Sequence, residues 1–98
     1  MIEEIRRAIA KEVIDPELHI NIVDMGLVYA IEEVAGGAIQ ITMTLTSMGC
    51  PAGPQLLKAV HDIAAAVSGR SVSVSLVWDP PWKQDMLSAD AKDELGIA

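Results

Sequence analysis

Apolar residues recur at helical spacing at the start of the chain. The positions are separated by three or four residues, with charged residues between them: Ile2, Ile5, Ile9 and Val13. This spacing predicts an amphipathic helix. We expect the helix to end before Asp15-Pro16, because a residue that precedes proline is disfavoured in the helical conformation.

Three later segments have the composition or the alternation of strands. Residues 27–34 are rich in β-forming residues and precede Gly36-Gly37, a pair that suits a tight hairpin turn. Apolar and polar side chains alternate strictly over residues 39–46, and valine alternates with serine over residues 71–75 in a segment that continues to Trp78. Between the first helix and the first strand, residues 14–26 have no regular period and predict an ordered loop.

Two further helices complete the predicted order of elements. Apolar positions from Leu56 to Val67 predict a helix closed by Ser68-Gly69, and Ser88 can cap a short helix that ends at Gly96. The order α-β-β-α-β-α predicts an α+β fold in one domain over residues 1–98. Two strands have one apolar and one hydroxyl-bearing face, so we expect a small three-stranded mixed sheet with helices on one face.

This topology predicts which loops meet. The hairpin makes the first two strands antiparallel, and the helical crossover favours a parallel relation between the second and third. One edge of the sheet then receives four segments: Asp15-Pro16-Glu17, Asp24-Met25-Gly26, Thr46 to Pro51, and Asp79 to Trp82. The opposite edge receives only glycine-rich turns. We therefore expect any chemistry at the first edge.

Charge and cysteine content narrow the function. Seven Lys and Arg against fourteen Asp and Glu give a net charge of −7, which disfavours binding to nucleic acid and to membrane surfaces. No apolar stretch is long enough to span a bilayer, and the acidic start Met1-Ile2-Glu3-Glu4 is unlike a signal peptide. A single cysteine excludes an intrachain disulfide and points to a cytoplasmic protein.

Cys50 is the central candidate at the predicted edge. It stands just before the second long helix, where free backbone N–H groups and the helix dipole should favour the thiolate over the thiol. The alternative is a buried structural cysteine, since free cysteines are often buried. One cysteine cannot supply the thiolates that a stable iron–sulfur cluster usually takes, so any metal at Cys50 must share ligands with another molecule.

Acidic and hydroxyl side chains are the other candidates. With Cys50, we name Thr46 and Asp24 as candidate reactive residues, and as candidate binding residues Asp15, Glu17, Thr44 and Asp79. We expect the acids to surround the sulfur. Each acid alone fits a turn or capping role equally well. Trp82 is more typical of a packing residue than of a binding platform.

Together these motifs are recognisable. The segments Asp15-Pro16-Glu17-Leu18, Asn21 to Tyr29, Met43-Thr44-Leu45-Thr46 with Gly49-Cys50-Pro51, and Asp79-Pro80-Pro81-Trp82 resemble the SufT/PaaD-type iron–sulfur assembly family. The resemblance implies a fold like the C-terminal domain of NifU. It also implies that the family's key cysteine falls on Cys50 and its acidic and hydroxyl positions on Asp15, Glu17, Asp24 and Thr46.

The leading hypothesis is an iron–sulfur assembly or targeting factor with no turnover chemistry of its own. Cys50 would be a labile ligand or docking thiol, with no tightly bound cofactor and at most a transient cluster or iron shared with a partner or second subunit. The expected partners are the assembly machinery and apo client proteins, and a homodimer through an exposed sheet edge is compatible with the pattern. The alternatives are an enzyme with Cys50 as nucleophile and a pure adaptor module.

Overall fold

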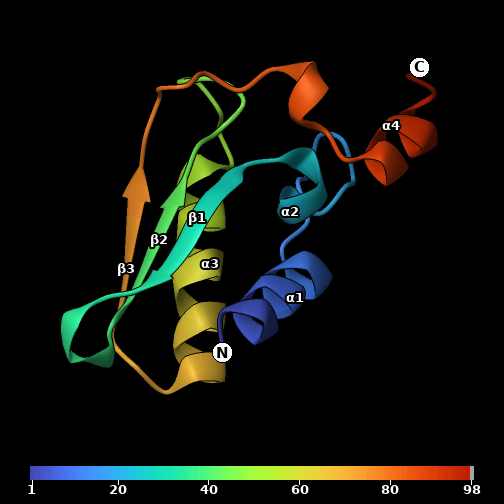
Figure 1. Cartoon of the computed structure of the whole chain (residues 1–98). Coiled ribbons are helices and arrows are strands. Elements are labelled where there is room, and N and C mark those ends of the chain that lie inside the picture. Colours follow the sequence, from blue (N-terminus) through green and yellow to red (C-terminus); the bar gives the residue numbers. More distant parts are fainter. Residues whose placement is uncertain (98) are drawn as a thin grey trace.

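The computed structural model describes residues 1–97, which form four α-helices, three strands and two short 3-10 helices. In chain order the elements are α1 (Ile2–Glu12), α2 (Ile22–Met25), β1 (Val28–Glu33), η1 (Ala35–Gly37), β2 (Ile39–Met43), α3 (Gly53–Ser68), β3 (Val72–Leu76), η2 (Gln84–Met86) and α4 (Ala89–Leu95). The predicted order is confirmed, with α2 and the 3-10 helices added (Figure 1).

The sheet has the predicted mixed topology. Its strand order is β1-β2-β3, with β1 antiparallel to β2 and β2 parallel to β3. Val28 at the start of β1 pairs with Met43 at the end of β2, and Met43 pairs with Leu76 at the end of β3. This register confirms that those three strand ends share one edge of the sheet, at the top of Figure 1.

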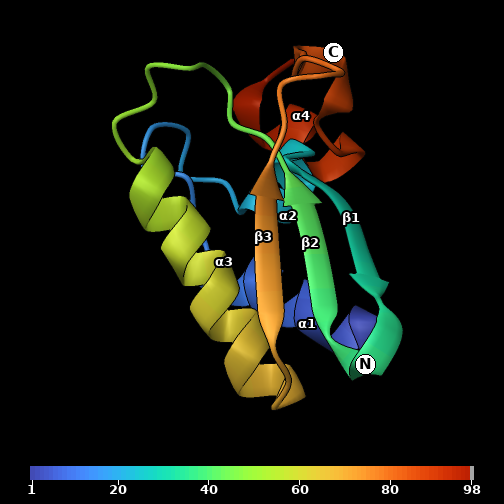
Figure 2. The same ribbon diagram turned by 90° about the vertical axis from the view of Figure 1, so that its left-hand side faces the viewer.

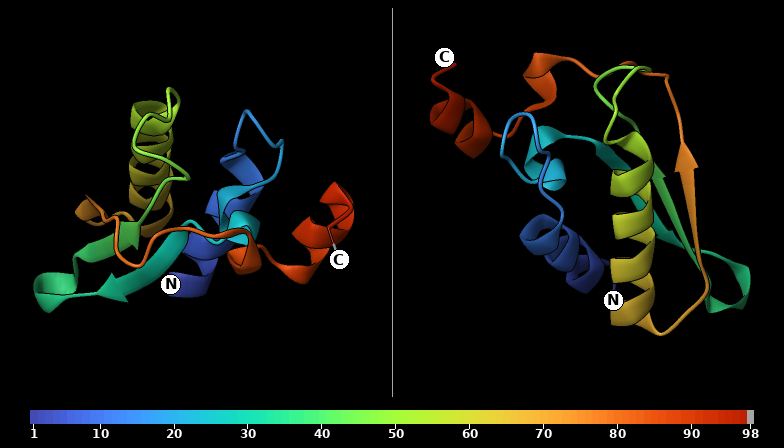
Figure 3. Two further views of the ribbon diagram at one scale, coloured as in Figure 1. Left: turned by 90° about the horizontal axis from the view of Figure 1, so that it is seen from above. Right: turned by 180° about the vertical axis from the view of Figure 1, so that it is seen from behind.

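One face of the sheet is covered by helices. Seen from above, α1 and α3 lie on the same side of the strands, and α4 lies beyond α2 at the end of the sheet (Figure 3). Ile39, Ile41 and Met43 of β2 are buried, and they belong to the same buried cluster as Ile5 and Ile9 of α1 and Val60 and Ala64 of α3. None of the helices within residues 1–97 is long and apolar enough to cross a membrane.

The segment predicted as a loop before β1 contains the short helix α2, so that expectation is wrong in part. Asn21 caps α2, because its side-chain oxygen accepts a hydrogen bond from the Asp24 amide at 2.9 Å. Gly26 ends α2 in the left-handed conformation, with φ of 82°. One turn of helix is too short to produce a readable period, which is why the apolar pattern did not predict it.

The second strand departs from its pattern near Thr44. Alternation over residues 39–46 places Thr44 on the half-exposed face, yet the side chain is fully buried and β2 ends at Met43. Residues from β1 and from the C-terminal segment cover this end of the sheet: the Tyr29 hydroxyl contacts Thr44 and also donates to the Pro80 carbonyl at 2.7 Å. Burial of Thr44 by residues that are distant in the sequence cannot be predicted from the alternation of apolar and polar residues along the strand.

Candidate functional site

The loops that carry the candidate residues gather at one end of the molecule. In Figure 1 the connection from β2 to α3 and the segment after β3 lie at the top, and the loop between α1 and α2 lies to the right, beside α2 and α4. Figure 2 shows the β2–α3 connection running from the end of β2 over to the start of α3. The strand register and the hydrogen bond from Trp82 to the Met25 carbonyl confirm that the strand-end segments share this edge, and Pro16 of the α1–α2 loop lines a hollow together with Ala52.

Cys50 lies in a turn at the entrance to α3. Its amide donates to the Ser47 carbonyl at 3.3 Å, and its carbonyl accepts from the Gly53 amide at 3.1 Å. The side chain is half-buried and packs against the hydrophobic core. Cys50 therefore lies at the predicted edge, partly exposed and away from the glycine turns.

The start of α3 packs closely against Leu45, just after β2. Gly53, the first residue of α3, is buried, and a Cβ atom at this position would lie 2.8 Å from Leu45 Cδ1. That distance is shorter than ordinary van der Waals contact, so the missing side chain allows the helix start to approach the strand end. The turn that carries Cys50 connects Leu45 to this closely packed helix start.

The start of α3 offers fewer free amides than the sequence suggests. The Gly53 N–H is occupied by the Cys50 carbonyl, and Pro54, the second helical residue, has no N–H. An anion at a helix start binds through such N–H groups. The expected support for a thiolate from unpaired amides is therefore reduced at these two positions.

The two candidate threonines differ in exposure. Thr44 is fully buried, and its hydroxyl donates to the Leu45 carbonyl at 3.4 Å. Thr46 is half-buried and lies in the loop that leads to Cys50. Thr46 is thus accessible to a ligand at this edge, whereas Thr44 is engaged within the fold.

Asp15 and Glu17 occupy one turn and play different parts in it. Asp15 is 3% exposed, and its Oδ1 accepts from the amides of Glu17 at 2.8 Å and Leu18 at 3.1 Å. This arrangement stabilises the turn between α1 and α2. Glu17 is exposed, so its carboxylate faces solvent near the functional edge.

Asp24 is engaged within α2 and its surroundings. Its Oδ2 accepts from Asn21 Nδ2 at 2.8 Å, and its carbonyl accepts from the Ser88 amide at 2.7 Å. These bonds join the cap of α2 to the cap of α4, since Ser88 is the N-cap of α4. Asp24 therefore has a clear structural role in addition to the reactive role proposed from the sequence.

Tyr29 is a residue at this edge that the motif search did not single out as a candidate. Its hydroxyl lies close to Thr44, Asp79 and the Pro80 carbonyl. Removal of the phenol from water raises its pKa above the ordinary value; the nearby Thr44 hydroxyl opposes this effect, and the negative charge of Asp79 adds to it. Its position beside Thr44 and Asp79 arises only in the folded chain. Its single sequence signal is its place at the end of the recognised segment from Asn21 to Tyr29.

Within the part of the chain that the structure describes, the acids form no metal-holding cluster with the sulfur. Among residues 1–97, no three His, Cys, Asp or Glu side chains converge in a way that could hold a metal ion. Asp15 and Asp24 are turned into their own local hydrogen bonds, as described above. Asp15 and Asp24 therefore have structural partners of their own, and a ring of acids around Cys50 stays a prediction.

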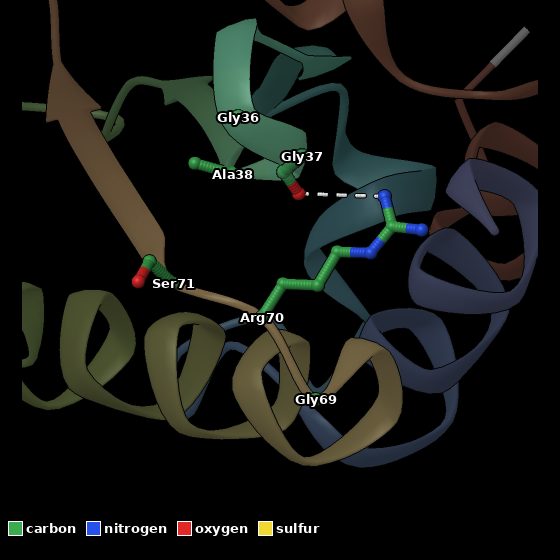
Figure 4. A pocket seen from close by; sticks show the side chains of 6 residues that line it. All are labelled: Gly36, Gly37, Ala38, Gly69, Arg70 and Ser71. Atoms are coloured by element: carbon green, nitrogen blue, oxygen red, sulfur yellow. Dashed lines mark hydrogen bonds between the residues drawn. The ribbon is translucent and has the colours of Figure 1, made fainter.

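A pocket lies at the opposite edge of the sheet, between the two glycine-containing turns. The pocket of about 440 Å³ is lined by the two turns, residues 36–38 and 69–71, and Arg70 donates across it to the Gly37 carbonyl at 3.3 Å (Figure 4). Arg70 is also paired with Glu33. No candidate residue lies here, which agrees with the assignment of this edge to ordinary turns.

Known proteins resemble this chain over most of its length. The Fe-S protein maturation auxiliary factor SufT of Staphylococcus aureus is 47% identical over 88% of this chain and 99% of its own length. The maturation auxiliary factor YitW of Bacillus subtilis is 44% identical over 89% of this chain and 86% of its own length. The crystal structure of a domain of unknown function from Bacillus anthracis superposes with a TM-score of 0.89 at 35% identity, covering 99% of this chain and 92% of that one.

The family assignment rests on a match to most of the described chain. Residues 2–76 match the family described as iron-sulfur cluster assembly protein. This range contains the first three of the four recognised segments, including Cys50, and ends just before Asp79. Together with the relatives above, the match shows that the chain belongs to the iron-sulfur cluster assembly protein family.

Proposed function

We propose that this protein is an accessory factor that helps to mature iron–sulfur proteins, with Cys50 as a labile ligand or docking thiol. The observation that carries the proposal is a half-buried lone thiol, on a turn that leads into a closely packed helix start, with no closed set of ligands around it in the described residues. Open coordination suits a handover, because an ion in a closed four-ligand site exchanges poorly. The printed names of the SufT and YitW relatives support the same role.

The proposed step is a ligand exchange. A cysteine thiolate of the client forms a bond to iron while the bond between iron and the Cys50 thiolate breaks. The proton released by the client's thiol is taken up, directly or through water, by the departing Cys50 thiolate. No electron is transferred, and the cluster is cargo throughout, so the protein needs no resident cofactor.

The other candidate residues receive different parts in this proposal. We assign to half-buried Thr46 the donation of a hydrogen bond to sulfur or to a bound ligand at the same edge. Asp15 and Asp24 act as positioning residues that hold the turn and α2. The exposed carboxylates of Glu17 and Asp79 are left to contact a partner.

A cysteine-dependent enzyme receives less support. Such an enzyme requires a base within hydrogen-bond reach of the nucleophile. In the described part of the chain, the hydrogen bonds of Cys50 involve only its backbone, and no carboxylate or imidazole bonds to its sulfur. The maturation role needs an accessible thiol but no base.

The proposal is tested by anaerobic reconstitution with iron and sulfide. Wild-type protein and Cys50→Ala are compared by absorption spectra, native mass and cluster transfer to an apo-acceptor. We expect the wild-type protein to gain a labile absorbing species and to pass it on, and the variant to do neither. Equal transfer by the two proteins would refute the role of the thiol.

A further inference from the structure

A second hollow lies beside the proposed site, between the end of α1 and the start of α3. Its volume is about 230 Å³, and its apolar lining consists of Val13, Ile14, Pro16, Ala52, Leu56 and Ala59. Figure 3 shows α1 and α3 side by side, with the loop that follows α1 near the start of α3. Ala52 is two residues from Cys50, so this hollow, here called the α1–α3 groove, adjoins the thiol's turn.

The size of the α1–α3 groove limits what can occupy it. Sites that enclose a small molecule usually have ~300–1,000 Å³, so this groove is too small for most cofactors. One large aliphatic or aromatic side chain of a protein partner fits its volume and its apolar walls. Such single anchors in apolar pockets dominate the energy of many protein interfaces.

The charged residues around the α1–α3 groove indicate which partner residues would flank the apolar side chain. Glu12 is the charged residue in the lining, and Glu17, next to the lining residue Pro16, is exposed. Lys58, beside Ala59, is already paired with Asp62 at 2.6 Å. Because the whole chain carries −7, lysine or arginine beside the anchor would be attracted to this rim.

A second copy of this chain is a poor occupant. Three of its exposed large apolar residues, Ile14, Val34 and Trp78, each have an acidic neighbour in the sequence. Met48 and Leu76 have uncharged neighbours, and Met1 carries the N-terminal ammonium, which lies 4.0 Å from Glu4 Oε1. None of these exposed residues is flanked by lysine or arginine, so we expect an anchor with such neighbours to come from another protein.

We propose that the α1–α3 groove binds an apolar side chain of a client protein that is flanked by lysine or arginine. This inference rests on the proposed maturation function, since it names the surface that brings the client to Cys50. Docking here would place the client next to the turn that presents the thiol. It does not require the thiol itself.

The test uses the whole protein and short synthetic peptides, followed by amide chemical shifts in NMR spectra. One peptide has a leucine flanked by lysines, a second has glutamates in place of the lysines, and a third has serine in place of the leucine. We expect only the first to bind, with shifts centred on Ala52, Gln55 and Ala59, and with affinity that falls as salt rises. Equal binding of the first two peptides, or shifts confined to another surface, would overturn the proposal.

Three variants make the test specific. Ala59→Phe fills the α1–α3 groove and should weaken binding about tenfold or more, which corresponds to about 1.4 kcal/mol. The matched control is Ala66→Phe, at an exposed position of the same helix outside the groove, which should bind as the wild type does. The double variant Glu12→Lys/Glu17→Lys changes exposed residues, leaves the core intact and should also weaken binding.

Failure of this inference is distinguishable from failure of the proposed function. Cys50→Ala should bind the leucine–lysine peptide as tightly as wild type, because the thiol is not part of the α1–α3 groove. If the peptide does not bind but reconstituted wild-type protein still transfers its cluster, the groove is wrong and the function stands. If groove-filling by Ala59→Phe leaves peptide binding unchanged, the groove is likewise not the binding surface.

Discussion

The indole of Trp82 donates a hydrogen bond from Nε1 to the carbonyl oxygen of Met25, at 2.7 Å. The two residues are 57 positions apart and belong to different recognised motifs. The bond ties the Asp79–Trp82 segment to the end of α2. The Asp79–Trp82 motif therefore stabilises the position of the Asn21–Tyr29 motif. Trp82 packs against the hydrophobic core, as the sequence suggested.

Loss of this bond should be measurable. Trp82→Phe removes the N–H donor and leaves the Met25 carbonyl without that partner, so we expect the free energy of unfolding to fall by about 1–2 kcal/mol. Chemical denaturation measures this change. Trp78→Phe, at a partly exposed position, is the control and should change stability by less than about 0.5 kcal/mol. Equal losses in the two variants would argue against the bond.

The end of α2 also packs closely against η2, at Gly26, the residue after Met25. A Cβ atom here would lie 2.4 Å from the Met86 carbonyl oxygen, and the residue has φ of 82°. Gly26→Ala should therefore destabilise by about 3 kcal/mol, from the strained backbone together with the overlap.

Gly36 gives the matched comparison for this variant. It has nearly the same φ, 81°, but nothing lies within 4 Å of the added Cβ. Gly36→Ala should cost only the backbone strain, about 1–2 kcal/mol. Thermal unfolding of both variants separates the two effects, and similar losses would mean that η2 does not pack against α2.

Asp15 is expected to act through its turn rather than through its charge. Asp15→Ala removes the acceptor for the Glu17 and Leu18 amides, and should lower stability by about 1–2 kcal/mol. Asp15→Asn keeps a side-chain oxygen and should restore most of that stability. It should also restore cluster transfer in the reconstitution assay. A stable Asp15→Asn protein that cannot transfer would instead assign the carboxylate a direct role.

The phenol of Tyr29 should titrate above its ordinary pKa of about 10. It is the sole tyrosine, so the ultraviolet absorbance of tyrosinate reports it alone. Asp79→Asn removes a charge that opposes ionisation and should lower this pKa. An unchanged titration would mean that Asp79 does not face the phenol.

The same shift has a consequence for stability. The pKa of Tyr29 is raised in the folded protein. The contribution of Tyr29 to the free energy of unfolding is therefore fully present below its pKa in the unfolded chain, near 10, and is lost as the pH rises through its pKa in the folded protein. Tyr29→Phe should therefore make the free energy of unfolding less sensitive to pH in this alkaline range. Denaturation at several pH values measures the difference.

Local pattern predicted the elements of this fold well, since each depends on neighbours in the sequence. The helix over residues 2–12, the hairpin and the Ser88 and Gly96 caps of α4 all follow from periodicity and capping chemistry. The pairing of strand ends followed from topology alone. What escaped was α2, which is a single turn, and the burial of Thr44 beneath Tyr29 and the C-terminal segment.

The candidate site was predictable only as a set of backbone segments. Motif positions indicated which loops meet, but the direction of each carboxylate depends on bonds that only the folded chain makes. The Asp15 carboxylate accepts a hydrogen bond within its own turn, and the Asp24 carboxylate accepts one from Asn21. Neither forms a metal site with Cys50 in the described residues. The α1–α3 groove also depends on the separation of two helices, which no local pattern encodes.

The central claim is that maturation depends on the Cys50 thiol, and the activity of client iron–sulfur enzymes in cells tests it most directly. A host strain without its own copy of the protein is supplied with wild type, Cys50→Ala or the exposed-face control Ser73→Ala, at equal protein levels. We predict that wild type and Ser73→Ala restore client activity and that Cys50→Ala leaves it at the level of the deficient strain. Full restoration by Cys50→Ala would contradict the account.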